Sequence, residues 1–213
     1  MSFCNIGCGQ TPTENWINFD NSLIVRLSNF PFVCYFLRWL KLIDDNQIKF
    51  MKVVRRHGIK FADARKKIPL PDNSLDVLYT SHMVEHLDQK EMLFFLKEAY
   101  RVLKPDGILR IVFPDLRKMI EEYNINLDAD IFTQKTGLTM DNPKTLIGRI
   151  KYLIIGNRGH KHMHDADSLK RLLLNNNFKK VDILAAGETS IPDVGHLNLY
   201  ERSGESGYIE AMK

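Results

Sequence analysis

A short apolar strand that breaks at a glycine turn near the start of the chain limits the possible folds more than any other feature. The residues are Asn5-Ile6-Gly7-Cys8-Gly9, and the first acid that could end a second strand, Asp20, follows Gly7 by only thirteen positions. In a dinucleotide-binding βαβ unit, the turn leads into a full helix that holds a pyrophosphate, and the ribose-binding acid lies about 20 residues on. Residues 10–15 contain a proline and no apolar face. We therefore predict a shortened first crossover.

A turn without a helix behind it is poorly suited to a pyrophosphate, because the helix N-terminus supplies the donors for the anion. It remains suited to a ligand with a ribose and no phosphate, and S-adenosylmethionine (SAM) is the commonest such ligand. Any strand-to-loop turn can also use glycine for a positive φ. The turn by itself therefore leaves a structural and a ligand-binding interpretation open.

Hydrophobic periodicity predicts an α/β fold. Apolar runs indicate strands at residues 2–6, 16–19, 59–62, 75–80, 108–113, 178–184 and 207–212. Between the fourth and fifth runs, apolar residues recur at helical spacing, with Asp88 as the N-cap and Pro105-Asp106-Gly107 as the stop. A second helix, capped by Asp165 or Asp167, precedes the sixth run. Strand, helix, strand in this order implies a parallel sheet with right-handed crossovers, here in one domain over residues 1–213.

Two stretches are inserts that this arrangement of strands and helices does not require. The first, residues 24–56, contains the aromatic run Phe30 to Leu40, which arginines and Pro31 interrupt too often for a membrane span. We expect an amphipathic lid over the ligand, and the alternative is a helix on a membrane surface, with residues 30–43 as the contact. The second, residues 119–159, follows the fifth strand. Open α/β sheets place substrate beyond the carboxyl ends of their strands, so we expect a substrate cap there.

Composition and charge exclude several classes of protein. The chain has 213 residues, 44% of them hydrophobic and 26% charged, which is ordinary for a soluble globular protein. Its net charge of +4 permits an anionic partner, but the basic residues lack interleaved aromatics, so we expect no nucleic acid. The first residues run almost directly into a core strand and leave no room for a signal peptide. We therefore expect a cytoplasmic protein with reduced cysteines.

Four segments together resemble the class I SAM-dependent methyltransferases, and they extend over nearly the whole chain. The segments are Asn5-Ile6-Gly7-Cys8-Gly9, Trp16-Ile17-Asn18-Phe19-Asp20, Phe61-Ala62-Asp63-Ala64 and residues 68–107. The resemblance implies a Rossmann-like sheet of seven mostly parallel strands with an antiparallel last strand. It also implies SAM as the cofactor and in-line transfer of its methyl group to an acceptor.

The resemblance assigns the cofactor to particular residues. Bare backbone at Gly7 and Gly9 would approach the methionine part of SAM. Asp20 would accept both ribose hydroxyls, while Asp63, beside Ala64, would accept the adenine amino hydrogens. As an alternative, Asp63 caps its own loop. The implied cofactor-binding residues are Asn5, Gly7, Cys8, Gly9, Asp20, Asp63, Ala64, Ser81, His82 and His86.

Histidines supply the candidates for catalysis. The resemblance places His160 just before the last crossover helix, where a histidine near the acceptor can take up a proton during transfer. His82, at the end of the fourth strand, and His164 are the other candidates. In many proteins such histidines are simply polar loop residues. If the segment is extended, His160, His162 and His164 would share one face, as the ligands of a metal site do.

One segment also matches a zinc-binding motif in its residue types and spacing. His82-x-x-Glu85-His86 fits the inverted zinc-protease signature. That motif requires its ligands on one helix, whereas His82 directly follows a buried strand, so we assign no metal ligand. A metal-dependent hydrolase built on the histidines remains the second alternative function.

Within the family, the closest likeness is to small bacterial enzymes associated with surface polysaccharide assembly. The likeness rests on Glu85-His86-Leu87, residues 110–116 and residues 188–193. It implies a small-molecule or sugar-type acceptor. The first alternative function is a partner protein that keeps the fold but has lost turnover, and that binds through residues 30–43.

Overall fold

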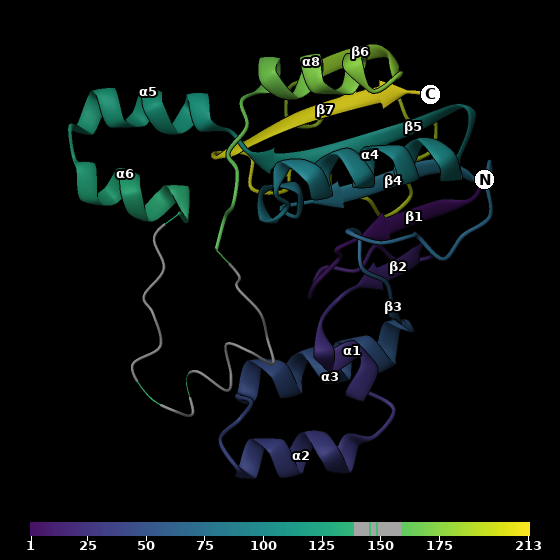
Figure 1. Ribbon diagram of the computed structural model, residues 1–213, viewed down its shortest axis with the longest axis vertical. Coiled ribbons are helices and arrows are strands. Elements are labelled where there is room, and N and C mark those ends of the chain that lie inside the picture. Colours follow the sequence, from purple (N-terminus) through teal and green to yellow (C-terminus); the bar gives the residue numbers. More distant parts are fainter. Residues whose placement is uncertain (139–144, 146–147, 149–158) are drawn as a thin grey trace.

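The computed structural model describes residues 1–138, 145, 148 and 159–213. These residues form a seven-stranded sheet with helices against one face and around one edge (Figure 1). The strands are β1 (Phe3–Ile6), β2 (Ile17–Asp20), β3 (Lys60–Phe61), β4 (Leu75–Ser81), β5 (Leu103–Pro114), β6 (Lys179–Leu184) and β7 (Ser206–Met212). The helices are α1 (Leu23–Leu27), α2 (Pro31–Trp39), α3 (Asp45–His57), the short 3-10 helix η1 (Val84–His86), α4 (Gln89–Val102), α5 (Leu116–Asn126), α6 (Ala129–Thr136) and α8 (Ala166–Asn175).

The order of the strands confirms the predicted fold. The sheet runs β3-β2-β1-β4-β5-β7-β6, with parallel pairing from β3 to β5. Strand β7 lies antiparallel between β5 and β6, as expected for the last strand. Residues 7–16, which connect the parallel strands β1 and β2, contain no helix, so the first crossover is indeed shortened.

The two faces of the sheet are covered differently. Helices α4 and α8 pack on one face, where Phe95, Leu96 and Leu169 are fully buried against the strands. On the other face, Trp16 and the tyrosines of β4 and β7 pack against Ile191 and other apolar residues of the stretch 185–205, which contains no helix. The sheet is therefore shielded by helices on one side and by an irregular segment on the other.

Helix boundaries follow the predicted caps. Asp88 caps α4 and forms a capping box with Glu91, and Asp165, one of the two predicted candidates, caps α8. Strand β5 begins at Leu103, five residues before the predicted start at 108. Leu75 pairs with Leu103 and Val77 pairs with Ile108, so the predicted turn at 105–107 lies in an irregularity of the strand.

The first insert forms α1, α2 and α3 at the β3 edge of the sheet (Figure 1). Helices α1 and α3 bury apolar residues in a cluster of their own, which also contains Cys8 and Ile59. Helix α2 contributes only Cys34 to the buried part of that cluster. Its outer face is exposed, although none of the helices in the described part of the chain is long and apolar enough to cross a membrane.

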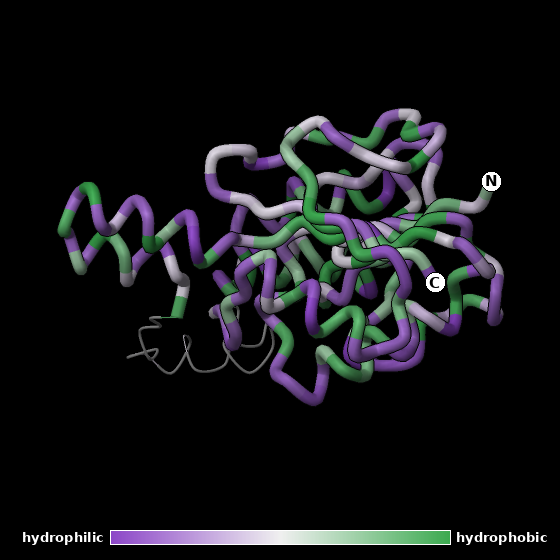
Figure 2. Tube along the Cα trace, turned by 90° about the horizontal axis from the view of Figure 1, so that it is seen from above, coloured by the Kyte–Doolittle hydropathy of each residue, from purple (hydrophilic) through white to green (hydrophobic). Residues whose placement is uncertain are grey.

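The second insert begins with α5 and α6, which contact each other and project away from the sheet (Figures 1 and 2). The expected short helices are therefore present in the first part of residues 119–159, and the role of this stretch as a substrate cap stays a prediction. The remainder of that stretch, residues 139–144, 146–147 and 149–158, lies outside the described residues.

A buried ion pair connects β5 to β7. Arg110, which is fully buried, donates from Nη1 to Glu210 Oε1 at 2.6 Å and to the Glu188 carbonyl at 2.9 Å. Glu210 also accepts hydrogen bonds from the Thr189 hydroxyl and from the amide and hydroxyl of Ser190. Burial raises the pKa of Glu210, but these hydrogen bonds and the one from Arg110 outweigh it, so the pKa lies below its ordinary value. The network fixes the stretch after β6 to the centre of the sheet.

Candidate functional site

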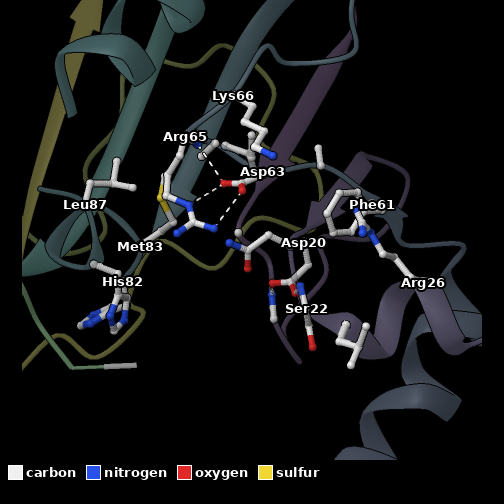
Figure 3. A pocket seen from close by; sticks show the side chains of 18 of the residues that line it. Asp20, Ser22, Arg26, Phe61, Asp63, Arg65, Lys66, His82, Met83 and Leu87 are labelled. Atoms are coloured by element: carbon white, nitrogen blue, oxygen red, sulfur yellow. Dashed lines mark hydrogen bonds and ion pairs between the residues drawn. The ribbon is translucent and has the colours of Figure 1, made fainter. Parts of the chain in front are cut away.

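A cavity of about 700 Å³ lies where β1, β2, β3 and β4 end (Figure 3). Its volume is within the range of small-molecule and cofactor sites. Helices α1 and α3 contribute Leu23, Arg26 and Phe50 to its wall, whereas no residue of α2 lines it. The first insert therefore contributes to the cavity wall through α1 and α3, and its role as a lid stays a prediction. Seven residues predicted to bind the cofactor line the cavity: Gly7, Gly9, Asp20, Asp63, Ala64, His82 and His86.

The glycine turn and Asp20 are held together by backbone hydrogen bonds. The amides of Gly7 and Cys8 donate to the Phe19 carbonyl, at 2.8 and 3.0 Å. The Asp20 carboxylate accepts from the Gly9 amide at 3.0 Å and from the Ser22 amide at 2.8 Å. Gly7 has a φ of +76°, and a Cβ there would lie 2.7 Å from Met83 Cγ, so glycine is required. A carboxylate only accepts hydrogen bonds, which suits the predicted binding of ribose hydroxyls by Asp20.

Asp63 is bound on both oxygens by Arg65. The guanidinium donates from Nε to Oδ1 at 2.8 Å and from Nη2 to Oδ2 at 2.9 Å, and the Arg65 amide donates to Oδ1 at 3.0 Å (Figure 3). Burial raises the pKa of Asp63, but these hydrogen bonds outweigh it, so the pKa is lowered and the group stays ionised. The alternative that Asp63 caps its own loop is therefore observed, and its binding of adenine stays a prediction.

The loop after Asp63 is anchored on α4. Arg101 donates to the carbonyls of Ile68 and Leu70, each at 2.9 Å, and to Glu98, which in turn accepts from the Ile68 amide. This anchoring fixes the position of the Asp63 loop relative to the sheet.

Three predicted cofactor residues do not line the cavity. Asn5 is buried and donates from its amide to Thr13 Oγ1 at 3.1 Å, so its side chain secures the first crossover. Cys8 is buried in the cluster under α1 and α3, and burial raises the pKa of its thiol. Ser81 ends β4 but is not among the residues that line the cavity.

His82 lines the cavity, but both of its ring nitrogens already have hydrogen-bond partners. Its Nε2 lies 2.8 Å from Ser206 Oγ, and Arg202 Nη1 lies 3.2 Å from its Nδ1. A guanidinium can only donate, so Nδ1 accepts and Nε2 carries the hydrogen. A role for His82 as a base would require Arg202 to move.

His86 and His160 meet around a buried carboxylate. Their rings lie 5.1 Å apart in an edge-to-face arrangement, and Glu85, which is 2% exposed, lies between them and His82. The amides of Lys161 and His162 donate to the Glu85 carbonyl, at 2.7 and 3.2 Å. These bonds bring the 159–165 segment to the end of β4.

The three histidines of the 159–165 segment do not share one site. His162 and His164 contact each other with ring centroids 4.5 Å apart, and both line a separate cavity of about 150 Å³ beside α4 and α8. Burial, assisted by His162, lowers the pKa of His164 to about 4, against the opposite influence of Glu85 and Asp165. His164 is therefore neutral at neutral pH and lies outside the larger cavity.

The buried His164 predicts a loss of stability in mild acid. The unfolded chain binds a proton on this residue near pH 6.5, whereas the folded protein does so only near pH 4. Stability should therefore fall as the pH decreases from about 6.5 toward 4, because protons favour the unfolded state. Urea unfolding at pH 7.5 and 5.5 measures this, and the loss should be smaller in His164→Gln. An equal loss in both proteins would contradict the assignment.

Sequence reasoning missed Arg65, and it missed the burial of Glu85 beside His82 and His160. The spacing of Asp63 and Arg65 is a usable signal, since an aspartate often hydrogen-bonds to the backbone two residues on. The burial of Glu85 has no comparable signal, because His160, one of its two histidine neighbours, is 75 positions away in the sequence.

Comparison with known proteins supports the same fold. Residues 42–111 match a family model described as a methyltransferase domain. A curated relative from Mycolicibacterium smegmatis, described as a probable S-adenosylmethionine-dependent methyltransferase, is 35% identical over 68 residues. The match covers 32% of this chain and 23% of the relative, so the chain spans less than a quarter of the relative's length.

Two solved structures resemble the whole chain. A SAM-dependent methyltransferase from Mesorhizobium loti gives a TM-score of 0.51 at 13% identity, with 100% of this chain and 90% of that chain covered. One from Methanosarcina mazei gives 0.50 at 16% identity, with 100% and 92% covered. At these identities the likeness shows the fold alone, which is the Rossmann-like fold of methyltransferases. The family model and the curated relative imply SAM as the cofactor.

Proposed function

We propose that the protein is a SAM-dependent methyltransferase that acts on a small-molecule or sugar-type acceptor. The observation that carries the proposal is the meeting of Gly7, Asp20 and Asp63 in one cavity, although they come from three different strand ends. When bound, SAM supplies a methyl group that is already activated by its sulfonium. The protein must hold it, exclude water and align an acceptor.

The cavity has two chemically different ends (Figure 3). Asp20 and Asp63 offer carboxylate oxygens at one end, which suits ribose hydroxyls and an amino group. His82 and Met83 lie at the other end, and His86 also lines the cavity. We assign the acceptor to this second end, because imidazole can take up a proton as an acceptor hydroxyl or amine is methylated. Arg26 and Lys66, both exposed at the wall, would favour an anionic acceptor such as a sugar phosphate.

The proposal is tested by separating cofactor binding from transfer. We expect S-adenosylhomocysteine to raise the melting temperature of the protein, and labelled SAM to transfer methyl to an acceptor in a metabolite screen. His160→Ala should slow transfer by ~100-fold or more, because the His160 ring packs on His86, which lines the cavity. SAM affinity should change little, because His160 itself does not line the cavity. Equal losses of both would show that the histidine is structural. Heat-shift without any turnover would favour the non-catalytic partner protein.

We further propose that α2 contacts an anionic membrane surface. Between residues 30 and 40, large apolar side chains are exposed to an unusual degree, among them Phe32 at 85% and Trp39 at 76%. Phe36 stacks on Trp39 with ring centroids 5.9 Å apart. Residues 23–57 contain seven Lys and Arg, all exposed, against two acids, which gives a local charge of +5 (7 − 2). Apolar rings with a surplus of cations match an acidic lipid surface.

Vesicle sedimentation tests the membrane contact. The protein should bind vesicles that contain phosphatidylglycerol more strongly than vesicles of phosphatidylcholine alone. The double variant Phe32→Ser, Trp39→Ser should lose most of this binding. Ile125→Ser is the matched control, because Ile125 is 82% exposed on α5, away from α2. No binding by the unaltered protein, or equal binding by the double variant, would disprove the contact, and dimers that dissociate in the double variant would assign α2 to a subunit interface.

A further inference from the structure

Three potential metal ligands lie together beside the larger cavity. Glu85, His86 and His160 each present one ligand atom, and these atoms all lie within 4.8 Å of one another. Glu85 and His86 belong to η1, directly after β4, and His160 is brought to them by the hydrogen bonds of Lys161 and His162 to the Glu85 carbonyl. The cluster is thus built from two distant parts of the chain.

Both imidazole rings are oriented by backbone carbonyls. Nδ1 of His86 lies 3.2 Å from the Gly159 carbonyl oxygen, and Nδ1 of His160 lies 2.7 Å from that of Thr136. A carbonyl only accepts, so Nδ1 carries the hydrogen in each ring, and Nε2 of the neutral ring keeps its lone pair. Metal-binding histidines are commonly held by such an Nδ1 hydrogen bond, which leaves Nε2 for the metal.

The His160 ring is also fixed by its surroundings. Gly137 has a φ of +62°, and a Cβ on it would lie 2.7 Å from His160 Nδ1, so the ring packs directly on the glycine backbone. In this position Nε2 of His160 lies 3.9 Å from Glu85 Oε1. The lone pair of a neutral ring therefore approaches a carboxylate, which is unfavourable unless the ring takes up a proton or a metal cation lies between them.

One oxygen of the Glu85 carboxylate lacks a hydrogen-bond partner among the described residues. Glu85 is 2% exposed, and its Oε2 has no hydrogen-bond partner among the described residues. His82 Nδ1 lies 3.6 Å from Oε1, but this nitrogen accepts a hydrogen bond from Arg202 and offers no proton in the neutral ring. A buried carboxylate without a donor or a cation is costly. A metal ion would satisfy the carboxylate and both imidazoles at once.

We propose that Glu85, His86 and His160 bind one divalent transition-metal ion, with zinc as the expected metal. Two imidazoles and one carboxylate form a ligand set that zinc accepts, with a fourth position open. Ligands of a tetrahedral zinc lie about 3.4 Å apart, so the three side chains close in by about 1 Å on binding. This inference deepens the proposed function, and it makes His160 a metal ligand that activates the acceptor through the metal instead of a proton acceptor.

Metal binding is measured directly, in the absence of SAM. The full chain is freed of metal with a chelator and titrated with Co²⁺, whose absorption reports on coordination, and then with Zn²⁺ as competitor. We expect one Co²⁺ per chain, displaced by Zn²⁺, and at least ~10-fold weaker binding in each of His86→Ala and His160→Ala. His162→Ala is the matched control, since His162 is an exposed neighbour that does not belong to the cluster.

The outcomes separate this inference from the proposed function. If the unaltered protein binds no stoichiometric Co²⁺ or Zn²⁺, or if His162→Ala weakens binding as much as His160→Ala, the metal site is disproved. Circular dichroism of each variant establishes that it is folded. A heat-shift with S-adenosylhomocysteine is recorded on the same samples. Metal binding without that shift would uphold the site and remove the methyltransferase proposal in favour of a metal-dependent hydrolase, while the shift without metal binding would do the reverse.

Discussion

Glu210→Ala is expected to lower the free energy of unfolding by about 3–5 kcal/mol, because it leaves the fully buried Arg110 guanidinium without its carboxylate. Glu210 also accepts three hydrogen bonds from Thr189 and Ser190, which lose their acceptor in the variant. Arg110 Nε and Nη2 already lack partners among the described residues, so the guanidinium has no evident substitute. Urea unfolding monitored by circular dichroism measures the loss.

An exposed ion pair provides the control for this prediction. Arg202 and Glu205 lie 3.7 Å apart and are each more than half exposed, so Glu205→Ala should cost less than about 1 kcal/mol. A Glu210→Ala protein that unfolds at the same urea concentration as the Glu205→Ala protein would show that the buried pair does not stabilise the sheet.

Asp63→Ala is expected to weaken SAM binding by about 10–100-fold, since hydrogen bonds to a charged group contribute about 1.5–3 kcal/mol. The carboxylate is held ionised and in place by Arg65, and it faces the same cavity as Asp20. Calorimetric titration with SAM measures the change in affinity.

Arg65→Ala distinguishes a direct role of Asp63 from a role of the ion pair. This variant keeps the carboxylate and the hydrogen bond from the residue 65 amide, so it should retain most of the SAM affinity. If both variants lose SAM affinity equally, the Asp63–Arg65 ion pair contributes to binding by holding the loop in shape, and Asp63 has no direct role. Unchanged affinity in Asp63→Ala would remove Asp63 from the binding site.

Elements with strong local signals were predicted well from the sequence. The apolar run of β4 and the periodic residues of α4 are bounded by turn residues and by Asp88, and the structure places them as expected. The start of β5 was predicted five residues late, because Pro105-Asp106-Gly107 has the composition of a turn. The pairing of Leu75 with Leu103 extends the strand across that sequence, and such pairing has no local signal.

The candidate site was predicted in outline but not in its chemistry. Glycines and acids at strand ends were found, since the carboxyl ends of parallel strands meet at one edge of the sheet. The partners of these groups were not found: Arg65 on Asp63, Arg202 on His82, and Thr136 on His160. A hydrogen bond between residues that lie 120 positions apart, as in the second pair, depends on the packed fold and leaves no spacing pattern in the sequence.

Strand β7 sets a condition on how the protein is made. It lies between β5 and β6 and is hydrogen-bonded to both, whereas β5 and β6 do not pair with each other. Residues 206–212 must therefore be present before β5 and β6 can be joined in one sheet. During synthesis, the growing chain holds an unfinished sheet with an open β5 edge until Met212 has left the ribosome. Such an edge is prone to pair with other chains, so slow or interrupted translation of residues 206–212 should favour aggregation over folding.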